Sequence, residues 1–190
     1  MKIAIILLTC VLSVITSSAY ARDIKGVSLP ESVQLDATTP ALVLNGAGVR
    51  SKFVFSIYVG ALYLSDKATS ADAVLQQPGA RRVSMHILYD EISKEKLVDG
   101  WNDGFRNNST EQEFNAVRER LASFNEFFQT VVKGDVIVMD YLPGVGTRVH
   151  INDQLKGTIP GADFQRALLK VWLGNEPADD SLKQAMLGGE

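Results

Sequence analysis

The sequence predicts an α+β domain in which helices cover one face of a mostly antiparallel sheet. Residues 51–64 form an apolar run rich in Phe, Val, Ile and Tyr, as is typical of a buried strand. Residues 135–159 hold three strand-length segments, separated by the turn signals Pro143-Gly144 and Asn152-Asp153. Between these regions, residues 93–128 carry apolar side chains at the spacing of two amphipathic helices.

The first half of the chain is expected to be rich in strands. Pro30 interrupts a segment of strand character at residues 27–35, which favours an edge position because proline cannot donate a hydrogen bond to a sheet. A short strand at residues 41–44 is expected to end in a turn at Asn45-Gly46. The long strand at residues 51–64 follows this turn.

Two amphipathic helices are expected in the middle of the chain. The first begins at Ser93, and its apolar face recurs every four residues: Leu97, Trp101 and Phe105. The second begins after Thr110, which fits a capping box with Glu113. Its apolar stripe comprises Phe114, Val117, Leu121, Phe124 and Phe128.

Other elements complete the expected domain. A strand is predicted at residues 82–89, and short helices at residues 70–76 and 180–187. Residues 162–173 form an amphipathic helix that Gly174 ends.

Residues 1–21 are predicted to be a cleaved signal peptide. Lys2 precedes an apolar core at residues 3–15, which is too short to span a bilayer, and the segment ends in the A-x-A pattern of Ala19-Tyr20-Ala21. No later segment is long and apolar enough to be a transmembrane helix. We therefore expect a periplasmic or secreted protein whose mature chain, residues 22–190, is a single domain.

Composition excludes several classes of function. The formal net charge is −3, and loss of residues 1–21 removes one lysine and no acid, so the mature chain carries −4, which argues against nucleic-acid binding. Cys10 lies in the leader, and only His86 and His150 could otherwise bind zinc, so no metal is expected. Gly46-Ala47-Gly48 lacks the third glycine of a dinucleotide loop and precedes a strand rather than a helix, so no cofactor is expected.

Arg50 is the charged residue that calls most for an explanation. It lies at the start of the apolar run, where its guanidinium must find water, a carboxylate or a ligand anion. The simpler interpretation is an arginine at a strand end, paired with a surface acid.

Asp90-Glu91 could be an acid/base pair, although a solvated turn before the Ser93 helix explains it equally simply.

Four segments of the sequence resemble the chalcone isomerase superfamily, and the exported bacterial chalcone isomerase-like proteins in particular. They are GAGVR, KFVFSIYVGALYL, ISKEKLVDGWNDGF and TIPGADFQRALLKVWLGNEPADDSLKQAMLG, and the resemblance spans residues 27–188. It implies an open-faced β-sandwich, in which a layer of helices covers a large antiparallel sheet.

The resemblance also implies where the site lies. Isomerases of this superfamily close chalcones with an arginine after G-x-G, a strand threonine, a helix tyrosine, a nearby asparagine and a late polar residue. Carried over, the arginine is retained as Arg50, whereas the other positions hold Tyr58, Ser93, Gly100 and Val171. Chalcone isomerase activity is therefore not expected, and the pair of Arg50 and Tyr58 resembles the fatty-acid-binding members instead.

We therefore hypothesise a periplasmic, non-catalytic binder of a fatty acid or a similar apolar anion, with no cofactor. The expected ligand-binding residues are Arg50, Tyr58, Ser93, Leu97, Gly100, Trp101 and Val171. An arginine fork matches a carboxylate in two-point geometry, and a tyrosine hydroxyl adds a neutral donor. Tyr58 could equally be a core tyrosine with its hydroxyl at the rim, and Gly100 and Gly104 could simply let their helix pack closely.

Two other classes of function stay open. The first is an isomerase or intramolecular lyase for an exported substrate, in which Arg50 stabilises an oxyanion and Tyr58 is the acid. The second is an accessory protein whose apolar surface serves a protein partner in the cell envelope.

Overall fold

The computed structural model describes residues 21–189. Residues 1–20, which make up most of the predicted signal peptide, lie outside the described residues. Within residues 21–189 the strands are β1 (Ala21–Ile24), β2 (Val27–Pro30), β3 (Ser32–Val33), β4 (Leu42–Lys52), β5 (Phe55–Leu64), β6 (Arg81–Ile87), β7 (Glu91–Ile92), β8 (Val131–Val132), β9 (Val136–Leu142), β10 (Gly146–Ile151) and β11 (Gln154–Ile159). The helices are α1 (Ala71–Gln76), α2 (Lys94–Asn107), α3 (Glu111–Asn125), α4 (Ala162–Leu173) and α5 (Asp180–Met186).

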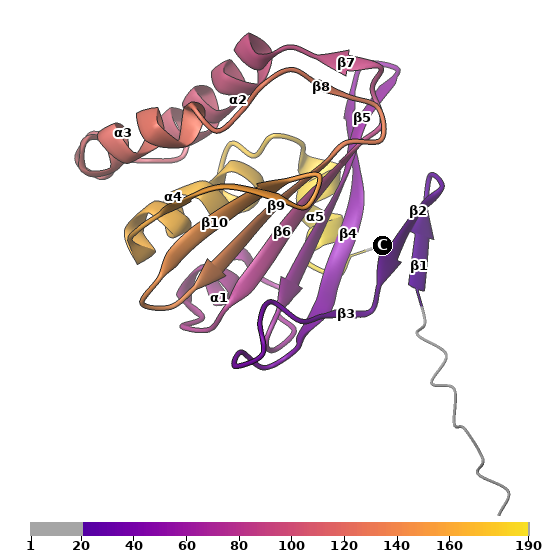
Figure 1. Ribbon diagram of the computed structural model, residues 1–190, viewed down its shortest axis with the longest axis horizontal. Coiled ribbons are helices and arrows are strands. Elements are labelled where there is room, and N and C mark those ends of the chain that lie inside the picture. Colours follow the sequence, from indigo (N-terminus) through magenta and orange to yellow (C-terminus); the bar gives the residue numbers. More distant parts are fainter. Residues whose placement is uncertain (1–20, 190) are drawn as a thin grey trace, which may run out of the picture.

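Seven strands form one antiparallel sheet, in the order β11-β10-β9-β6-β5-β4-β3. Buried side chains from all five helices join the sheet in one apolar cluster, so the helices cover one face (Figure 1). A smaller cluster lies on the opposite face, where the β1–β2 hairpin packs Leu29 against β4 and β5. The predicted α+β class, with helices grouped on one face, is confirmed.

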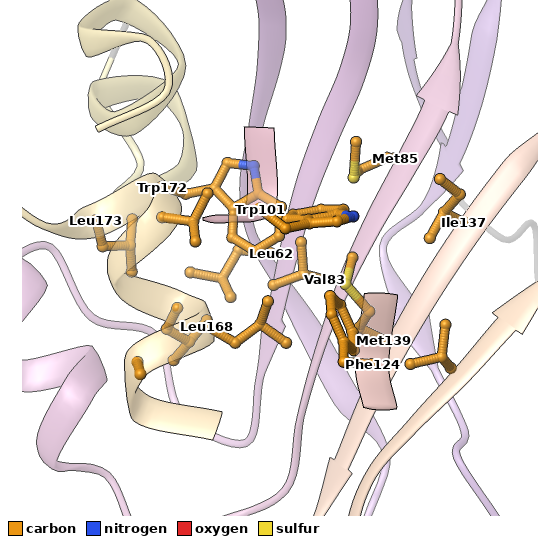
Figure 2. Packing of buried hydrophobic residues seen from close by; sticks show 14 of the residues in the cluster. Leu62, Val83, Met85, Trp101, Phe124, Ile137, Met139, Leu168, Trp172 and Leu173 are labelled. Carbon is orange, nitrogen blue, oxygen red and sulfur yellow. The ribbon is translucent and has the colours of Figure 1, made fainter. Parts of the chain in front are cut away.

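The main core lies between α2, α3, α4 and the strands β5, β6 and β9 (Figure 2). The Trp101 ring is central to it, with its centroid 5.5 Å from that of Phe124 and 5.7 Å from that of Trp172. Such edge-to-face aromatic pairs stabilise a core beyond the area that they bury. This aromatic cluster fixes α2 against α4, and both helices line the cavity described below.

The helix starts predicted from the sequence are confirmed. Ser93 caps α2, and Thr110 forms the full capping box with Glu113 at the start of α3. Asn152 and Asp153 both have positive φ values, 50° and 64°, as expected for the tight turn between β10 and β11. Only Phe128 departs from the predicted stripe, because α3 ends at Asn125.

The turn predicted at Asn45-Gly46 is wrong. Strand β4 runs through these residues with a bulge, because the Asn45 amide bonds to Ala68 and to the Met186 carbonyl across the fold. The chain turns instead at Phe53 and Val54. The long strand predicted at residues 51–64 is therefore two strands.

Glycines on β4 and β5 form the surface against which α5 packs. A Cβ atom on Gly46 would lie 2.1 Å from the Ala185 carbonyl oxygen, and one on Gly48 would lie 2.6 Å from the Ala185 Cβ. Gly46 and Gly48 are therefore a packing surface for a helix, whereas Ala47 between them belongs to the cluster on the opposite face. Since α5 follows directly on residues 176–178, this packing also sets the position of one wall of the cavity.

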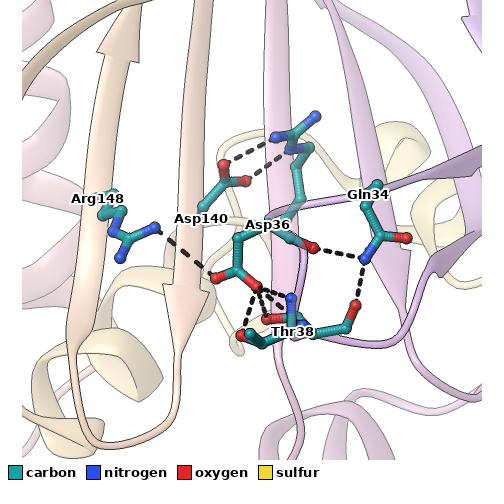
Figure 3. Close-up of polar contacts among 7 residues, drawn as sticks. Gln34, Asp36, Thr38, Asp140 and Arg148 are labelled. Atoms are coloured by element: carbon teal, nitrogen blue, oxygen red, sulfur yellow. Dashed lines mark hydrogen bonds and ion pairs between the residues drawn. The ribbon is translucent and has the colours of Figure 1, made fainter.

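On the face away from the helices, polar residues are paired with one another (Figure 3). Arg82 on β6 and Asp140 on β9 are opposite each other in the sheet and form a two-point ion pair of 2.6 and 2.8 Å. Asp36 accepts hydrogen bonds from Thr38 and Thr39, which hold the pKa of its carboxyl well below its usual range. These side chains are paired with one another, so they stabilise the sheet and are not candidates for binding or catalysis.

Glu91 lies in β7, which pairs with β8 in a small two-stranded sheet that was not predicted, and Asp90 is in the bend just before it. No helix among residues 21–189 has the length and apolar character needed to cross a membrane.

Candidate ligand-binding site

A cavity of about 670 Å³ opens between α2 and the ends of β4, β5 and β6. Its size is within the range of about 300–1,000 Å³ that is usual for small-molecule sites. The apolar wall consists of Ile57, Tyr58, Met85, Ile92, Leu97, Trp101 and Val171. Charged and polar side chains, among them Arg50, Lys96, Asp99, Asp103 and Glu176, line the rest. The cavity therefore combines an apolar wall with charged groups, as an amphiphilic ligand requires.

Arg50 lies on β4 directly opposite Tyr58 on β5. Its Nε donates to the Ala178 carbonyl oxygen at 3.4 Å, and its guanidinium carbon lies 5.8 Å from the centre of the Tyr58 ring. Among residues 21–189, no carboxylate lies within 4.0 Å of its guanidinium nitrogens. The interpretation of Arg50 as a partner of a surface acid is therefore wrong for the described part of the chain.

Asp179, the residue after the Ala178 that Arg50 contacts, uses its carboxylate elsewhere. Asp179 caps α5 by accepting from the Leu182 N–H at 2.9 Å, and it also accepts from the Ser51 N–H at 3.0 Å. Both bonds hold its carboxylate at the helix start, where its negative charge interacts favourably with the helix dipole. The Arg50 guanidinium, which is only half-buried, thus keeps donors available toward the cavity.

Tyr58 is almost fully buried, with 4% of its surface exposed. Its hydroxyl accepts a hydrogen bond from the Trp172 Nε1 at 2.9 Å. Burial raises the pKa of Tyr58 to about 12, with nearby Arg50 opposing the shift. The phenol therefore stays protonated at neutral pH, and a hydroxyl that accepts from Trp172 can still donate its own proton to a ligand.

Trp101 lines the cavity and also carries a buried, unpaired donor. It is 4% exposed, and its indole Nε1 has no hydrogen-bond partner among the described residues. In Figure 2 this nitrogen lies at the end of the ring nearest Met85, which also lines the cavity. An unpaired buried N–H is unfavourable, so this indole lowers the stability of the core that it otherwise fills.

Six of the seven predicted site residues line this one cavity: Arg50, Tyr58, Leu97, Gly100, Trp101 and Val171. The exception is Ser93, whose hydroxyl accepts from the Lys96 N–H at 3.3 Å and caps α2. Its assignment to the site is therefore corrected, because the helix start uses the side chain that the resemblance placed near the ligand.

Gly100 and Gly104 have different surroundings. A Cβ atom on Gly104 would lie 2.8 Å from Val171 Cγ1, so Gly104 lets α2 approach α4 closely. A Cβ atom on Gly100 would have no neighbour within 4 Å. The close-packing explanation therefore applies to Gly104, whereas Gly100 leaves space beside the cavity.

Several cavity residues were missed by sequence reasoning. Lys96, Asp99, Asp103 and Asn107 recur on α2 at steps of three and four, beside the apolar stripe, and this polar stripe was a usable signal. Residues 176–178 carried no such signal, since the fold alone brings the connection between α4 and α5 to the cavity. Among residues 21–189, no group of three or more His, Cys, Asp or Glu side chains is placed to hold a metal ion.

The fold and this cavity define a class of protein in which a layer of helices on an antiparallel sheet borders one sizeable cavity. The chain belongs to the chalcone isomerase-like family, whose model matches residues 21–188. Among solved structures it is similar to a fatty-acid binding protein of Arabidopsis thaliana, with a TM-score of 0.65 and 16% sequence identity over 85% of this chain and 92% of that one. Among curated proteins, no sequence matches significantly.

Proposed function

We propose that the protein is an exported, non-catalytic binder of a fatty acid or a similar apolar anion. The observation that carries this proposal is Arg50, which contributes a guanidinium without a carboxylate partner among the described residues to a cavity with an apolar wall. A carboxylate in the cavity would supply the missing counter-charge, and an acyl chain would cover the apolar wall. The fold shared with a fatty-acid binding protein agrees with this assignment.

The proposed arrangement of the ligand follows from the donors. The carboxylate accepts from Arg50, and the Tyr58 hydroxyl donates a second, neutral hydrogen bond. The chain then extends along Ile57, Met85, Leu97 and Trp101. Each buried methylene contributes about 0.8 kcal/mol, so most of the affinity comes from the chain and the selectivity comes from the head group.

Tyr58 suits binding better than proton transfer. An efficient general acid has a pKa near the working pH, whereas the pKa of Tyr58 is raised to about 12. The Trp172 N–H would favour a phenolate, but burial has the larger effect and keeps the hydroxyl neutral. A fixed neutral donor beside an arginine is what recognition of a carboxylate requires.

The proposal is tested by identifying what the protein carries. The protein is purified from its own cell envelope, and the bound molecules are examined by native mass spectrometry and after organic extraction. We expect a long-chain carboxylate at up to one equivalent in the wild type, and its loss in an Arg50→Ala variant prepared in parallel. A neutral lipid retained equally by both proteins would contradict the role of Arg50.

A further inference from the structure

The turn between β4 and β5 exposes three apolar side chains to solvent. Phe53 is 91% exposed, Val54 is 90% exposed and Phe55 is 54% exposed. We call these residues the apolar tip. The other large apolar side chains of the described chain that are exposed occur singly, on other elements: Val132, Val145 and Leu155. Scattered apolar residues are normal on a protein surface, whereas a contiguous group marks an interaction site.

The backbone at the apolar tip departs from the usual chemistry of a tight hairpin. Lys52 pairs with Phe55, so Phe53 and Val54 form a two-residue turn, and Phe53 has a φ of +55°. Positive φ in such turns is normally given to Gly, Asn or Asp, as at Asn152-Asp153. A bulky side chain is unfavourable in this region, and no packing contact compensates because the ring is exposed. A strained and exposed phenylalanine points to a function outside folding.

The apolar tip lies at the mouth of the cavity. Phe53, Phe55 and Lys52 are all among its lining residues, and the Phe55 ring packs edge-on against Tyr89 with centroids 5.7 Å apart. Arg50 lies on the same strand, just inside the mouth. A partner that covers the tip therefore also covers the entrance to the cavity.

We propose that the apolar tip inserts into the surface of a lipid bilayer and holds the cavity mouth against it. Three side chains on one turn are far too few for a stable protein interface, which needs about 800 Å² from each partner. A bilayer needs no complementary shape, and it accepts aromatic and aliphatic side chains at its interface. Lys52 flanks the tip, where its ammonium can meet a lipid phosphate while its stem stays beside the apolar groups.

The charge of the chain indicates which force dominates. The mature chain carries a formal net charge of −4, and Glu91, Asp99 and Asp103 also line the cavity, so general attraction to an anionic surface is not the driver. Insertion of the apolar tip therefore contributes most of the free energy of membrane binding, and anionic lipid adds only a small preference. With the mouth against the membrane, an acyl ligand passes between bilayer and cavity without crossing water; this clause alone rests on the proposed function.

The test uses the mature chain and vesicles of phosphatidylethanolamine with a minor fraction of phosphatidylglycerol. Val54→Asp removes an exposed tip side chain that does not line the cavity. The matched control is Val145→Asp, the same substitution in the β9–β10 turn, which the strand register places at the opposite end of the sheet. Sedimentation with vesicles is measured for the wild type and for each variant. All of these proteins begin at the same residue.

We expect wild type and Val145→Asp to sediment equally and Val54→Asp to partition about tenfold less, which corresponds to loss of one buried valine. Phe53→Asn should lower partition similarly while leaving the unfolding midpoint unchanged or higher, since asparagine tolerates positive φ. Equal sedimentation of Val54→Asp and Val145→Asp, or none by the wild type, would overturn the proposal. Self-association that Val54→Asp abolishes, without vesicle binding, would assign the tip to a second copy of the chain. Calorimetry of fatty acid without vesicles tests the proposed function separately.

Discussion

The hydroxyl of Tyr58 on β5 accepts a hydrogen bond from the indole Nε1 of Trp172 on α4, over 2.9 Å. Both side chains are buried, so the bond joins the sheet to the helix layer behind the Tyr58 side of the cavity. It also orients the phenol, because a hydroxyl that accepts from one side has its own proton free for another acceptor. This one hydrogen bond thus stabilises the fold and also orients the hydroxyl that would donate to a ligand.

Tyr58→Phe should therefore destabilise the ligand-free protein. The substitution leaves the Trp172 N–H buried without an acceptor, which costs about 1–3 kcal/mol in the free energy of unfolding, measured by denaturant titration. In the double variant with Trp172→Phe, the unpaired donor is gone, so the cost should be less than the sum of the two single costs. Strictly additive costs would show that the bond contributes nothing.

The same phenol predicts a loss of stability in alkali. The folded pKa of Tyr58 is about 12, whereas a tyrosine in the unfolded chain titrates near 10, so the folded state holds the proton more tightly. The stability that this tighter proton binding contributes is fully present below about pH 10 and is lost as the pH rises through about 12. The free energy of unfolding should fall over this window in the wild type, and less steeply in Tyr58→Phe. Parallel profiles for the two proteins would contradict the assignment.

Two glycines one turn apart on α2 should respond to alanine in opposite ways. Gly104→Ala places a methyl group 2.8 Å from Val171 Cγ1, and such overpacking costs about 1–3 kcal/mol. Gly100→Ala meets no atom within 4 Å and gains about 1 kcal/mol of helix propensity. Thermal or denaturant unfolding of the two variants measures the difference. Equal destabilisation by both would mean that Gly100 is not beside open space.

The predicted leader gives a prediction about the N-terminus. Cleavage after Ala21 would leave Arg22 as the first residue, and β1 would lose only its pairing of Ala21 with Pro30. The intact mass of the exported protein should match a chain that begins at Arg22. A mass that includes Cys10 with attached lipid would identify a lipoprotein instead.

Local signals in the sequence predicted helix starts well and the turns less well. The capping box of Thr110 and Glu113 and the cap at Ser93 depend on residues within one turn, so the sequence contains their whole cause. Asn45-Gly46 has the composition of a turn, yet its amide bonds to Ala68 and Met186, partners that only the folded chain brings near. The real turn at Phe53-Val54 lacks turn residues, and we attribute this to the interaction proposed for the apolar tip.

The site shows the same division between local and long-range causes. The resemblance placed Arg50 and Tyr58 together, and sheet register makes them direct neighbours. Ser93 was misplaced because its hydroxyl is used by the helix start, a competing local role. The link of Tyr58 to Trp172 could not have been predicted, since it joins residues 114 positions apart through the packing of α4.

The account depends most on Arg50 as the anchor for a carboxylate, and calorimetry of a long-chain fatty acid against the matching alcohol measures this directly. A charge-assisted hydrogen bond contributes roughly 1.5–3 kcal/mol, so the wild type should prefer the acid by roughly tenfold to a hundredfold. The matched control is Arg106→Ala, which removes an arginine that stacks on Phe114 and does not line the cavity. Arg106→Ala should keep the preference, and Arg50→Ala should erase most of it. Equal affinity of the wild type for acid and alcohol would contradict the anchoring role and leave Arg50 as a residue of the fold.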